Sequence, residues 1–79
     1  MKINVRYFAA LRDQRGLPSE AIESDKCNPA DIYADLNRQF KFSLSERQVR
    51  FAVNGEYVEA DHELKDGDEL AFIPPVAGG

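Results

Sequence analysis

The fold is decided by one stretch of this 79-residue chain, Asn28-Pro29-Ala30-Asp31-Ile32-Tyr33-Ala34-Asp35-Leu36-Asn37-Arg38-Gln39-Phe40. Its Asn-Pro start can cap a helix and open the first turn. Ile32, Leu36 and Phe40 recur every four residues and share one helix face, which Tyr33 flanks. The stretch therefore predicts an amphipathic helix that ends near Phe40. Because its apolar face must be buried, other elements have to cover it.

Alternating polarity predicts five strands around this helix. Their expected ranges are residues 2–8, 19–24, 49–53, 56–60 and 69–73. The polar residues of 19–24 indicate an edge strand. Asn54-Gly55 predicts a two-residue hairpin turn, because both positions of such a turn need positive φ.

The remaining segments connect these elements. A short helix is expected over residues 9–15, with Gly16 as its stop. Residues 41–48 stay open, with Ser43 or Ser45 able to cap a further turn. Leu64 is expected to plug the core, and residues 66–68 to form a tight turn. The fold class is then α+β, with one mixed sheet packed on one main helix; we hypothesise that the first and last strands are parallel neighbours.

Length and composition limit the class of protein. A chain of 79 residues with 43% hydrophobic content is expected to fold as one domain. No stretch approaches the ~20 apolar residues of a membrane span, and the alternating N-terminus does not resemble a signal peptide. The single cysteine, Cys27, cannot form an internal disulfide. A cytoplasmic location is therefore expected.

The charge is unevenly distributed along the chain. The net charge is −4, and residues 51–79 carry Lys65 as their only lysine or arginine among many Asp and Glu residues. This balance argues against nucleic acid as a partner. It suits docking against a basic protein surface, or simply a solvated acidic face.

Six residues follow the last strand: Pro74-Pro75-Val76-Ala77-Gly78-Gly79. Proline has no N–H to donate, so the pair ends the strand. Fully extended, the six residues reach roughly 20 Å. We expect a domain over residues 1–73 and a flexible tail over residues 74–79 that can place its terminal carboxylate in another protein's active site. The alternative is a frayed end without a role.

Three apolar side chains are expected outside the core. Phe8 falls on the polar face of the first strand, Ile73 alternates with Phe72, and Tyr57 is out of phase with Val58. If the first and last strands are neighbours, Phe8 and Ile73 lie together where the tail leaves. Such a cluster indicates a protein-docking surface, although single exposed aromatic residues are ordinary.

Three segments resemble the small, sulfur-carrying subunits of molybdopterin synthases. They are Tyr7-Phe8-Ala9-Ala10-Leu11-Arg12-Asp13, then Ala52-Val53-Asn54 with Leu64-Lys65-Asp66-Gly67-Asp68-Glu69-Leu70, and the ending Phe72-Ile73-Pro74-Pro75-Val76-Ala77-Gly78-Gly79. The Pro-Pro-Val-x-Gly-Gly ending is specific, whereas residues 37–48 add no support. The resemblance implies a ubiquitin-like β-grasp fold.

The resemblance also implies that Gly79 is the working residue. In such proteins an activating enzyme adenylates the terminal carboxylate with ATP and Mg²⁺, and a persulfide donor supplies the sulfur of a thiocarboxylate. The tail then enters the large synthase subunit and delivers sulfur to cyclic pyranopterin monophosphate, which makes the molybdopterin dithiolene. The chain itself would hold no cofactor or metal. It would be a non-catalytic, sulfur-donating subunit of a heterotetramer with two carriers on a dimer of large subunits.

By the same resemblance, a set of residues contacts the large subunit or the activating enzyme. These are Phe8, Arg12, Tyr57 and Ile73, together with the tail residues Pro74, Pro75, Val76, Ala77 and Gly78. Arg12 could pair with a partner carboxylate, or it could be a solvated helix residue.

Other functions remain open at this point. The chain could carry sulfur for the thiamin thiazole or for tRNA thiolation, or it could be a non-enzymatic ubiquitin-like interaction module. Cys27 precedes the main helix and could relay sulfur, although such a cysteine is more often incidental. His62 has no Cys or His at ligand spacing, so no metal site is expected.

Overall fold

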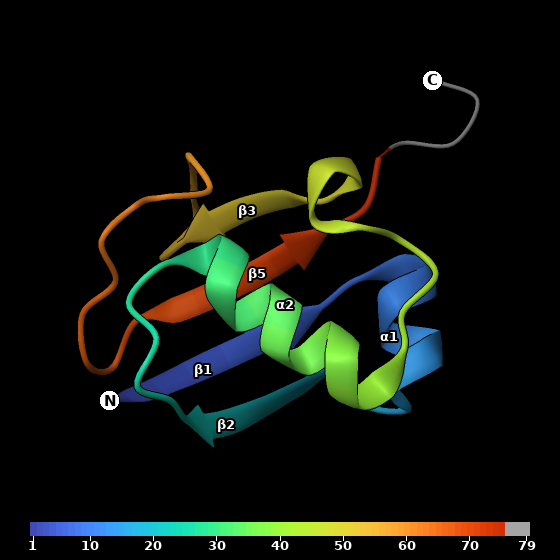
Figure 1. Ribbon diagram of the computed structural model, residues 1–79, viewed down its shortest axis with the longest axis horizontal. Coiled ribbons are helices and arrows are strands. Elements are labelled where there is room, and N and C mark those ends of the chain that lie inside the picture. The colour runs from blue at the N-terminus through green and yellow to red at the C-terminus, as the bar shows by residue number, and fades with distance from the viewer. Residues whose placement is uncertain (76–79) are drawn as a thin grey trace.

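The computed structural model describes residues 1–75 of the chain (Figure 1). In chain order, its elements are β1 (Lys2–Tyr7), α1 (Ala9–Arg15), β2 (Ser19–Glu23), α2 (Pro29–Phe40), the 3₁₀ helix η1 (Glu46–Gln48), β3 (Arg50–Val53), β4 (Glu56–Val58) and β5 (Glu69–Ile73). The expected α+β class and order of elements are confirmed. No helix within these residues is long and apolar enough to cross a membrane.

The strands form one mixed sheet in the order β2-β1-β5-β3-β4. β1 and β5 run parallel, and every other neighbouring pair is antiparallel. α2 lies across one face of the sheet, and α1 lies beyond the end of β1 (Figure 1). The parallel pairing of the first and last strands is therefore confirmed, as is the edge position of β2.

Helix α2 begins as its sequence predicts. The Asn28 side chain accepts a hydrogen bond from the Asp31 backbone N–H at 2.9 Å, which satisfies a donor that the helix leaves free. Ile32 and Leu36 are buried against the sheet, and the helix stops at Lys41, whose φ is 56°. Tyr33 was expected to flank this face, but it is fully buried.

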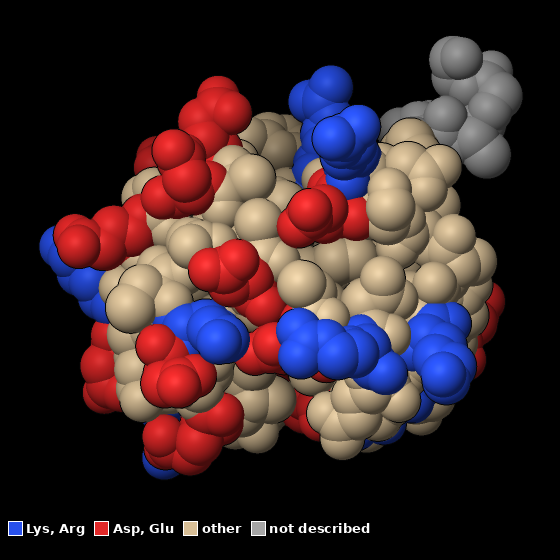
Figure 2. Space-filling view, in the orientation of Figure 1, with Lys and Arg blue, Asp and Glu red and all other residues tan. Residues whose placement is uncertain are grey.

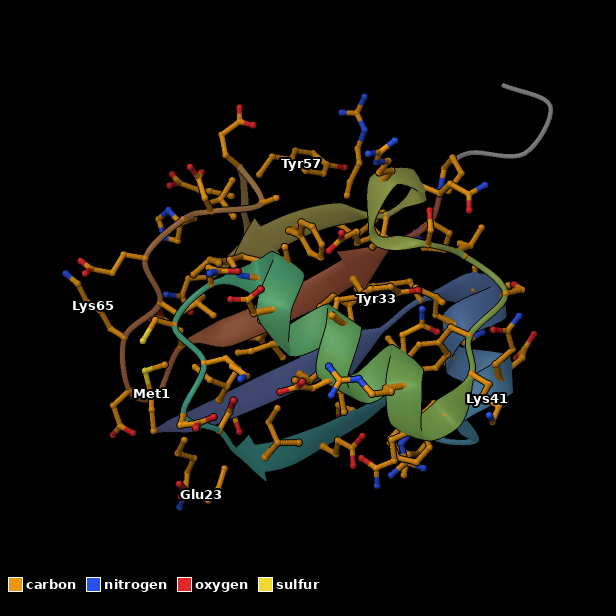
Figure 3. All side chains as sticks on the ribbon, viewed as in Figure 1. Met1, Glu23, Tyr33, Lys41, Tyr57 and Lys65 are labelled. Atoms are coloured by element: carbon orange, nitrogen blue, oxygen red, sulfur yellow. The ribbon has the colours of Figure 1, made fainter. Side chains whose placement is uncertain are left out.

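Tyr33 is buried because its hydroxyl has a partner. The hydroxyl donates a hydrogen bond to the Leu44 carbonyl at 2.6 Å, while the ring meets Phe72 edge-on at 5.0 Å between centroids. The polar tip thus reaches the 41–48 loop and the ring fills the core. In Figure 3, Tyr33 extends from α2 toward the 41–48 loop. Burial raises the pKa of its hydroxyl to about 12.

One apolar core joins the sheet to α2. It consists of Ile3, Val5, Tyr7, Leu11, Ile32, Tyr33, Leu36, Phe42, Val49, Phe51, Val53, Leu64, Leu70 and Phe72. Leu64 comes from the long loop before β5 and is 4% exposed, so its expected burial in the core is confirmed. Its backbone N–H donates to the Cys27 carbonyl at 2.8 Å, which ties this loop to the start of α2.

The turns form where glycine and asparagine residues predicted them. Asn54 and Gly55 have φ values of 51° and 88°, as the predicted hairpin turn between β3 and β4 requires. β4 ends at Val58 rather than Ala60, because the chain then turns toward the start of α2, where the Ala60 carbonyl accepts the Ala30 N–H at 3.1 Å. Of the two candidate serines, Ser45 opens the further turn, η1.

Candidate functional site

The base of the tail lies where β1 and β5 end. Tyr7 pairs with Phe72 across the two parallel strands, so the residues that follow them, Phe8 and Ile73, lie at the same end of the sheet. Pro74 and Pro75 continue from Ile73 without strand structure. The remaining site residues expected from the sequence, Val76, Ala77, Gly78 and Gly79, lie outside the described residues.

Phe8 is held in place by its own backbone. It caps α1 in an extended conformation, with φ −126° and ψ 150°, and its carbonyl accepts the Leu11 N–H at 3.1 Å. Tyr7 before it and Leu11 after it are both buried, while Phe8 is 37% exposed. The chain therefore presents this ring to solvent between two buried anchors.

The face of the sheet opposite α2 carries an apolar surface. Ala71 pairs with both Arg6 and Ala52, Ala52 pairs with Tyr57, and Ile73 pairs with Arg50. Because side chains alternate along a strand, these residues belong to the face that α2 leaves uncovered, and Phe8, which follows Tyr7, lies at the edge of this surface. We call the apolar members of this surface the outer-face patch: Phe8, Ala52, Tyr57, Ala71 and Ile73.

The outer-face patch combines two small, buried alanines with two exposed aromatic side chains. Ala52 and Ala71 are each 8% exposed, whereas Tyr57 is 66% exposed and Phe8 37%. Figure 3 shows Tyr57 at the rim of the sheet, away from α2. Tyr57 also borders an open groove of about 750 Å³ between η1, β3 and the chain that follows β4. Exposed aromatic residues beside small apolar residues are typical of protein-docking surfaces.

Two arginines stand beside these aromatic rings. The guanidinium carbon of Arg6 lies 5.5 Å from the Phe8 ring centroid, and that of Arg50 lies 5.9 Å from the Tyr57 ring centroid. Both distances fall within the range of cation–π attraction. Arg6 also approaches Glu69 at 3.8 Å, with both side chains about half exposed, so this ion pair contributes little to stability. The sequence indicated neither arginine.

Arg12 lies on α1 and is exposed. Its backbone N–H approaches the Phe8 carbonyl at 3.4 Å, and its own carbonyl accepts the Gly16 N–H at 2.9 Å. The side chain takes part in none of the ion pairs found among residues 1–75. Arg12 therefore lies one helical turn from Phe8 with its guanidinium open to a partner.

A second cluster, which the sequence did not predict, holds α1 against the sheet. The Tyr7 hydroxyl donates to Glu20 Oε2 at 2.6 Å, and the Arg15 guanidinium donates to both Glu20 oxygens at 2.8 Å. Arg15 also lies 4.0 Å above the Phe40 ring of α2. We call Tyr7, Arg15 and Glu20 the α1 clamp. The one sequence signal was Glu20, a carboxylate in phase with the apolar Ile22.

The pKa values within the α1 clamp follow from these contacts. Hydrogen bonds from Arg15 hold the pKa of the Glu20 carboxyl below its usual range, and the Tyr7 hydroxyl lowers it further. Burial raises the pKa of Tyr7 above its usual value, and the Glu20 carboxylate adds to this rise. At neutral pH the hydroxyl is therefore a donor and the carboxylate an acceptor. The clamp fixes α1 and, with it, the position of Phe8.

Cys27 and His62 both lie on the surface of the protein. The Cys27 thiol is exposed, and its closest polar contact is the Asp25 carbonyl at 3.8 Å. His62 is exposed in the loop before β5. Within residues 1–75, no group of three or more His, Cys, Asp or Glu side chains is placed to hold a metal ion.

The fold defines the class of protein. A mixed five-stranded sheet with parallel first and last strands, curved around one main helix, is the ubiquitin-like β-grasp architecture that the resemblance implied (Figure 1). The family model described as "ThiS family" matches residues 5–79. The chain belongs to the ThiS family.

Curated relatives match the chain over its whole length. It is 34% identical to the molybdopterin synthase sulfur carrier subunit of Escherichia coli, covering 98% of this chain and 99% of the relative. It is 37% identical to the protein of the same name from Chlamydomonas reinhardtii, with 100% of both chains covered.

Solved structures share the fold. One described as molybdopterin converting factor subunit 1, from Pyrococcus furiosus, is 36% identical, with a TM-score of 0.79, 96% of this chain covered and 99% of that one. Another is the complex of subunits 1 and 2 of the molybdopterin-converting factor from Helicobacter pylori. Its matching chain is 24% identical, with a TM-score of 0.71 and 100% of both chains covered, so it supports the fold alone.

Proposed function

We propose that this chain is the sulfur-carrier subunit of a molybdopterin synthase, with the carboxyl end of Gly79 as the position that carries sulfur. The observation that supports this most is the pairing of β1 with β5, because it brings the start of the tail beside the exposed Phe8. One partner could thus bind the outer-face patch and receive the tail at the same time. The curated relatives carry this function in their names.

The proposed chemistry needs no catalytic group from this chain. A carboxylate is a poor electrophile, and adenylation by an activating enzyme with ATP and Mg²⁺ gives it AMP as a leaving group. A persulfide donor then attacks the adenylate and displaces AMP, and a thiol reduces the resulting acyl disulfide, which releases the Gly79 thiocarboxylate. The thioacid is ionised at neutral pH, so its sulfur is a ready nucleophile. The large subunit then directs this sulfur to cyclic pyranopterin monophosphate, and two deliveries complete the dithiolene of molybdopterin.

The proposed partners are proteins of the cytoplasm. The large synthase subunit is the first, supported by the curated relatives, which are named as subunits of a molybdopterin synthase. The others are the adenylating enzyme and the persulfide donor. We propose an assembly of two carriers on a dimer of large subunits. The chain would take part as a sulfur-donating subunit rather than as the site of catalysis.

The docking residues proposed for these partners come from α1 and its N-cap, from β4 and β5, and from the tail. They are Phe8, Arg12, Tyr57 and Ile73, followed by the tail from Pro74 to Gly78. Phe8 and Tyr57 are exposed aromatic side chains, and aromatic anchors carry much of the binding energy at interfaces. Arg12 would pair with a partner carboxylate one helical turn away from Phe8.

Intact-mass measurement tests this proposal. The purified chain is incubated with the activating enzyme, ATP, Mg²⁺ and a sulfide source, and a gain of about 16 Da is expected as sulfur replaces oxygen. Deletion of Gly79 should abolish the gain while the melting temperature stays unchanged. Absence of any gain in the full chain would favour a non-enzymatic interaction module.

A second assay identifies the product. The sulfur-loaded chain is mixed with the large subunit and cyclic pyranopterin monophosphate, and molybdopterin is expected to form. If sulfur is loaded but no molybdopterin appears, the chain is a carrier for another product, such as the thiamin thiazole or a thiolated tRNA base.

A further inference from the structure

The charges of this chain are separated between the two ends of the sheet. The acidic loop of residues 59–68 lies at the start of β1, where the Lys2 N–H donates to Asp66 Oδ1 at 2.6 Å and the Asn4 N–H donates to the Asp68 carbonyl at 2.9 Å. Phe8 and Ile73 lie at the opposite end of β1 and β5. The acidic stretch that the sequence suggested as a docking face is therefore remote from the base of the tail.

The surface of the molecule shows the same separation. On the face seen in Figure 2, Asp and Glu side chains gather at the end formed by the 59–68 loop. Lys and Arg side chains lie mainly over the second half of α2, over α1 and near η1, toward the end where the tail leaves (Figures 1 and 2).

Two arginines are the charged residues that pair with the outer-face patch in the sheet rows nearest the tail. In the sheet rows nearest the tail, Arg6 stands in the row of Ala71, Ala52 and Tyr57, and Arg50 stands beside Ile73. Glu46 and Glu59 line the groove that Arg50 and Tyr57 border, and on the outer face of β5 Glu69 stands one row further from the tail. Its 3.8 Å separation from Arg6 is too long for a hydrogen bond. Arg6 therefore keeps most of its hydrogen-bonding capacity.

We infer that the outer-face patch binds a partner surface made of an apolar socket bordered by carboxylates, which pair with Arg6 and Arg50. The physical reason is desolvation. Each guanidinium lies against an aromatic ring that must enter the socket, so docking removes water from the charge as well as from the ring. A buried charge without a partner is costly. A carboxylate compensates for this cost and can accept two parallel hydrogen bonds from arginine.

The separation of charge would also orient the carrier as it approaches its partner. With a net charge of −4, an evenly charged carrier would be repelled by an acidic partner. A molecule with arginines at one end and carboxylates at the other is instead turned so that the arginine end approaches first. That end also carries the tail, so the same field would bring the sulfur-carrying residue to the partner.

This inference rests on the proposed function and deepens it, and a binding assay with the large synthase subunit tests it. Arg50→Gln and the double variant Arg6→Gln/Arg50→Gln are compared with Arg38→Gln. Arg38 is an exposed arginine on α2, so its variant removes the same charge away from the outer-face patch. Kd and the association rate constant are measured at two salt concentrations.

The expected result is a loss of affinity of about tenfold or more for the double variant, with a smaller loss for Arg50→Gln. Arg38→Gln should remain close to the unaltered chain. The difference between the double variant and the unaltered chain should shrink as salt rises, because exposed charges are screened. Arg50→Glu should weaken binding more than Arg50→Gln, since it places two carboxylates against each other.

The outcomes separate this inference from the proposed function. If Arg6→Gln/Arg50→Gln binds as tightly as the unaltered chain while Phe8→Ala binds weakly, the carboxylate-bordered socket is ruled out and the docking surface stands. Tighter binding by the arginine variants would indicate a basic partner surface and would also overturn the inference. If the unaltered chain does not bind the large subunit at all, the proposed function fails and this inference fails with it.

Discussion

Tyr7 and Phe72 lie opposite each other on the parallel strands β1 and β5, with ring centroids 5.8 Å apart and planes inclined at 53°. Tyr7 is 2% exposed and Phe72 is fully buried. The residues that follow them, Phe8 and Ile73, are more exposed: Phe8 lies just beyond β1 and caps α1, and Ile73 points to the opposite face of β5 from Phe72. A core contact thus anchors the base of the tail and the exposed ring of Phe8 at one place.

Replacing Phe8 and Phe72 should therefore have opposite consequences. Phe72→Ala is expected to lower the free energy of unfolding by about 3–5 kcal/mol, because it opens a cavity among packed aromatic rings. Phe8→Ala should change it by less than about 1 kcal/mol while weakening binding to the large subunit. Denaturant unfolding and a binding assay measure the two effects. A large loss of stability with unchanged affinity for Phe8→Ala would show that Phe8 serves the fold.

The α1 clamp should make stability depend on pH in the acid range. Tyr7→Phe removes the hydroxyl that donates to the Glu20 carboxylate at 2.6 Å, so a loss of about 1.5–3 kcal/mol is expected at pH 7. Because the folded-state pKa of Glu20 lies below its usual 4.5, the stability due to its ionised form is complete above pH 4.5. It is lost as the pH falls through the folded-state pKa.

The measurement for the clamp is urea unfolding of the unaltered chain and Tyr7→Phe between pH 7 and pH 3. The difference in unfolding free energy should shrink as the pH falls below 4.5, because the Glu20 carboxyl begins to take up a proton in the folded state. Tyr57→Phe is the matched control, because Tyr57 is 66% exposed. A difference for Tyr7→Phe that stays constant over this range would show that the Glu20 charge does not contribute.

Ala9 is a residue whose replacement by glycine should stabilise the protein. Its φ of 49° lies in the left-handed region, which costs a residue with a Cβ about 1 kcal/mol. Ala9→Gly is therefore expected to raise the free energy of unfolding by about 0.5–1 kcal/mol. Ala10→Gly, one residue later in α1, should lower it by about as much. Thermal unfolding of the two variants measures these changes in stability. Equal destabilisation by both would show that the backbone at Ala9 is not strained.

Leu64 should stabilise the loop of residues 59–68 as well as the core. Leu64→Ala is expected to cost about 2–5 kcal/mol of unfolding free energy, because the side chain is 4% exposed and closes the core beneath the loop. Hydrogen exchange should also rise at the Leu64 amide, which donates to the Cys27 carbonyl. Glu63→Ala, at the exposed neighbouring position, is the control and should change stability by less than about 0.5 kcal/mol.

Several features could be predicted from the sequence because they depend on neighbouring residues. Asn28 caps α2 by bonding to Asp31, three residues away. Gly16 ends α1 with a φ of 87°, and Asn54-Gly55 forms the hairpin turn. The exposure of Phe8 was expected from the alternation of residues 2–8, although β1 ends one residue earlier, at Tyr7. Caps, turns and strand faces are governed by local backbone geometry, so a single sequence is enough to indicate them.

Other features depend on residues far apart in the chain and could not be predicted. Nothing local to Tyr7 or Arg15 shows that both meet Glu20. The sequence predicted that Tyr33 flanks the buried face of α2. In the structure Tyr33 is buried, and the Leu44 carbonyl accepts a hydrogen bond from its hydroxyl. Arg6 and Arg50 belong to separate strands that β5 brings together.

The sequence by itself determined which residues face the core, where helices and turns begin and end, and that a slender Gly-Gly segment follows the last strand. Only the tertiary structure decided what lies beside that segment: an exposed aromatic surface bordered by arginines, with the acidic loop at the far end of the sheet. The physical reason is that side-chain periodicity and capping act over a few residues. Which charges and rings become neighbours depends instead on how distant strands pair to bury one shared core.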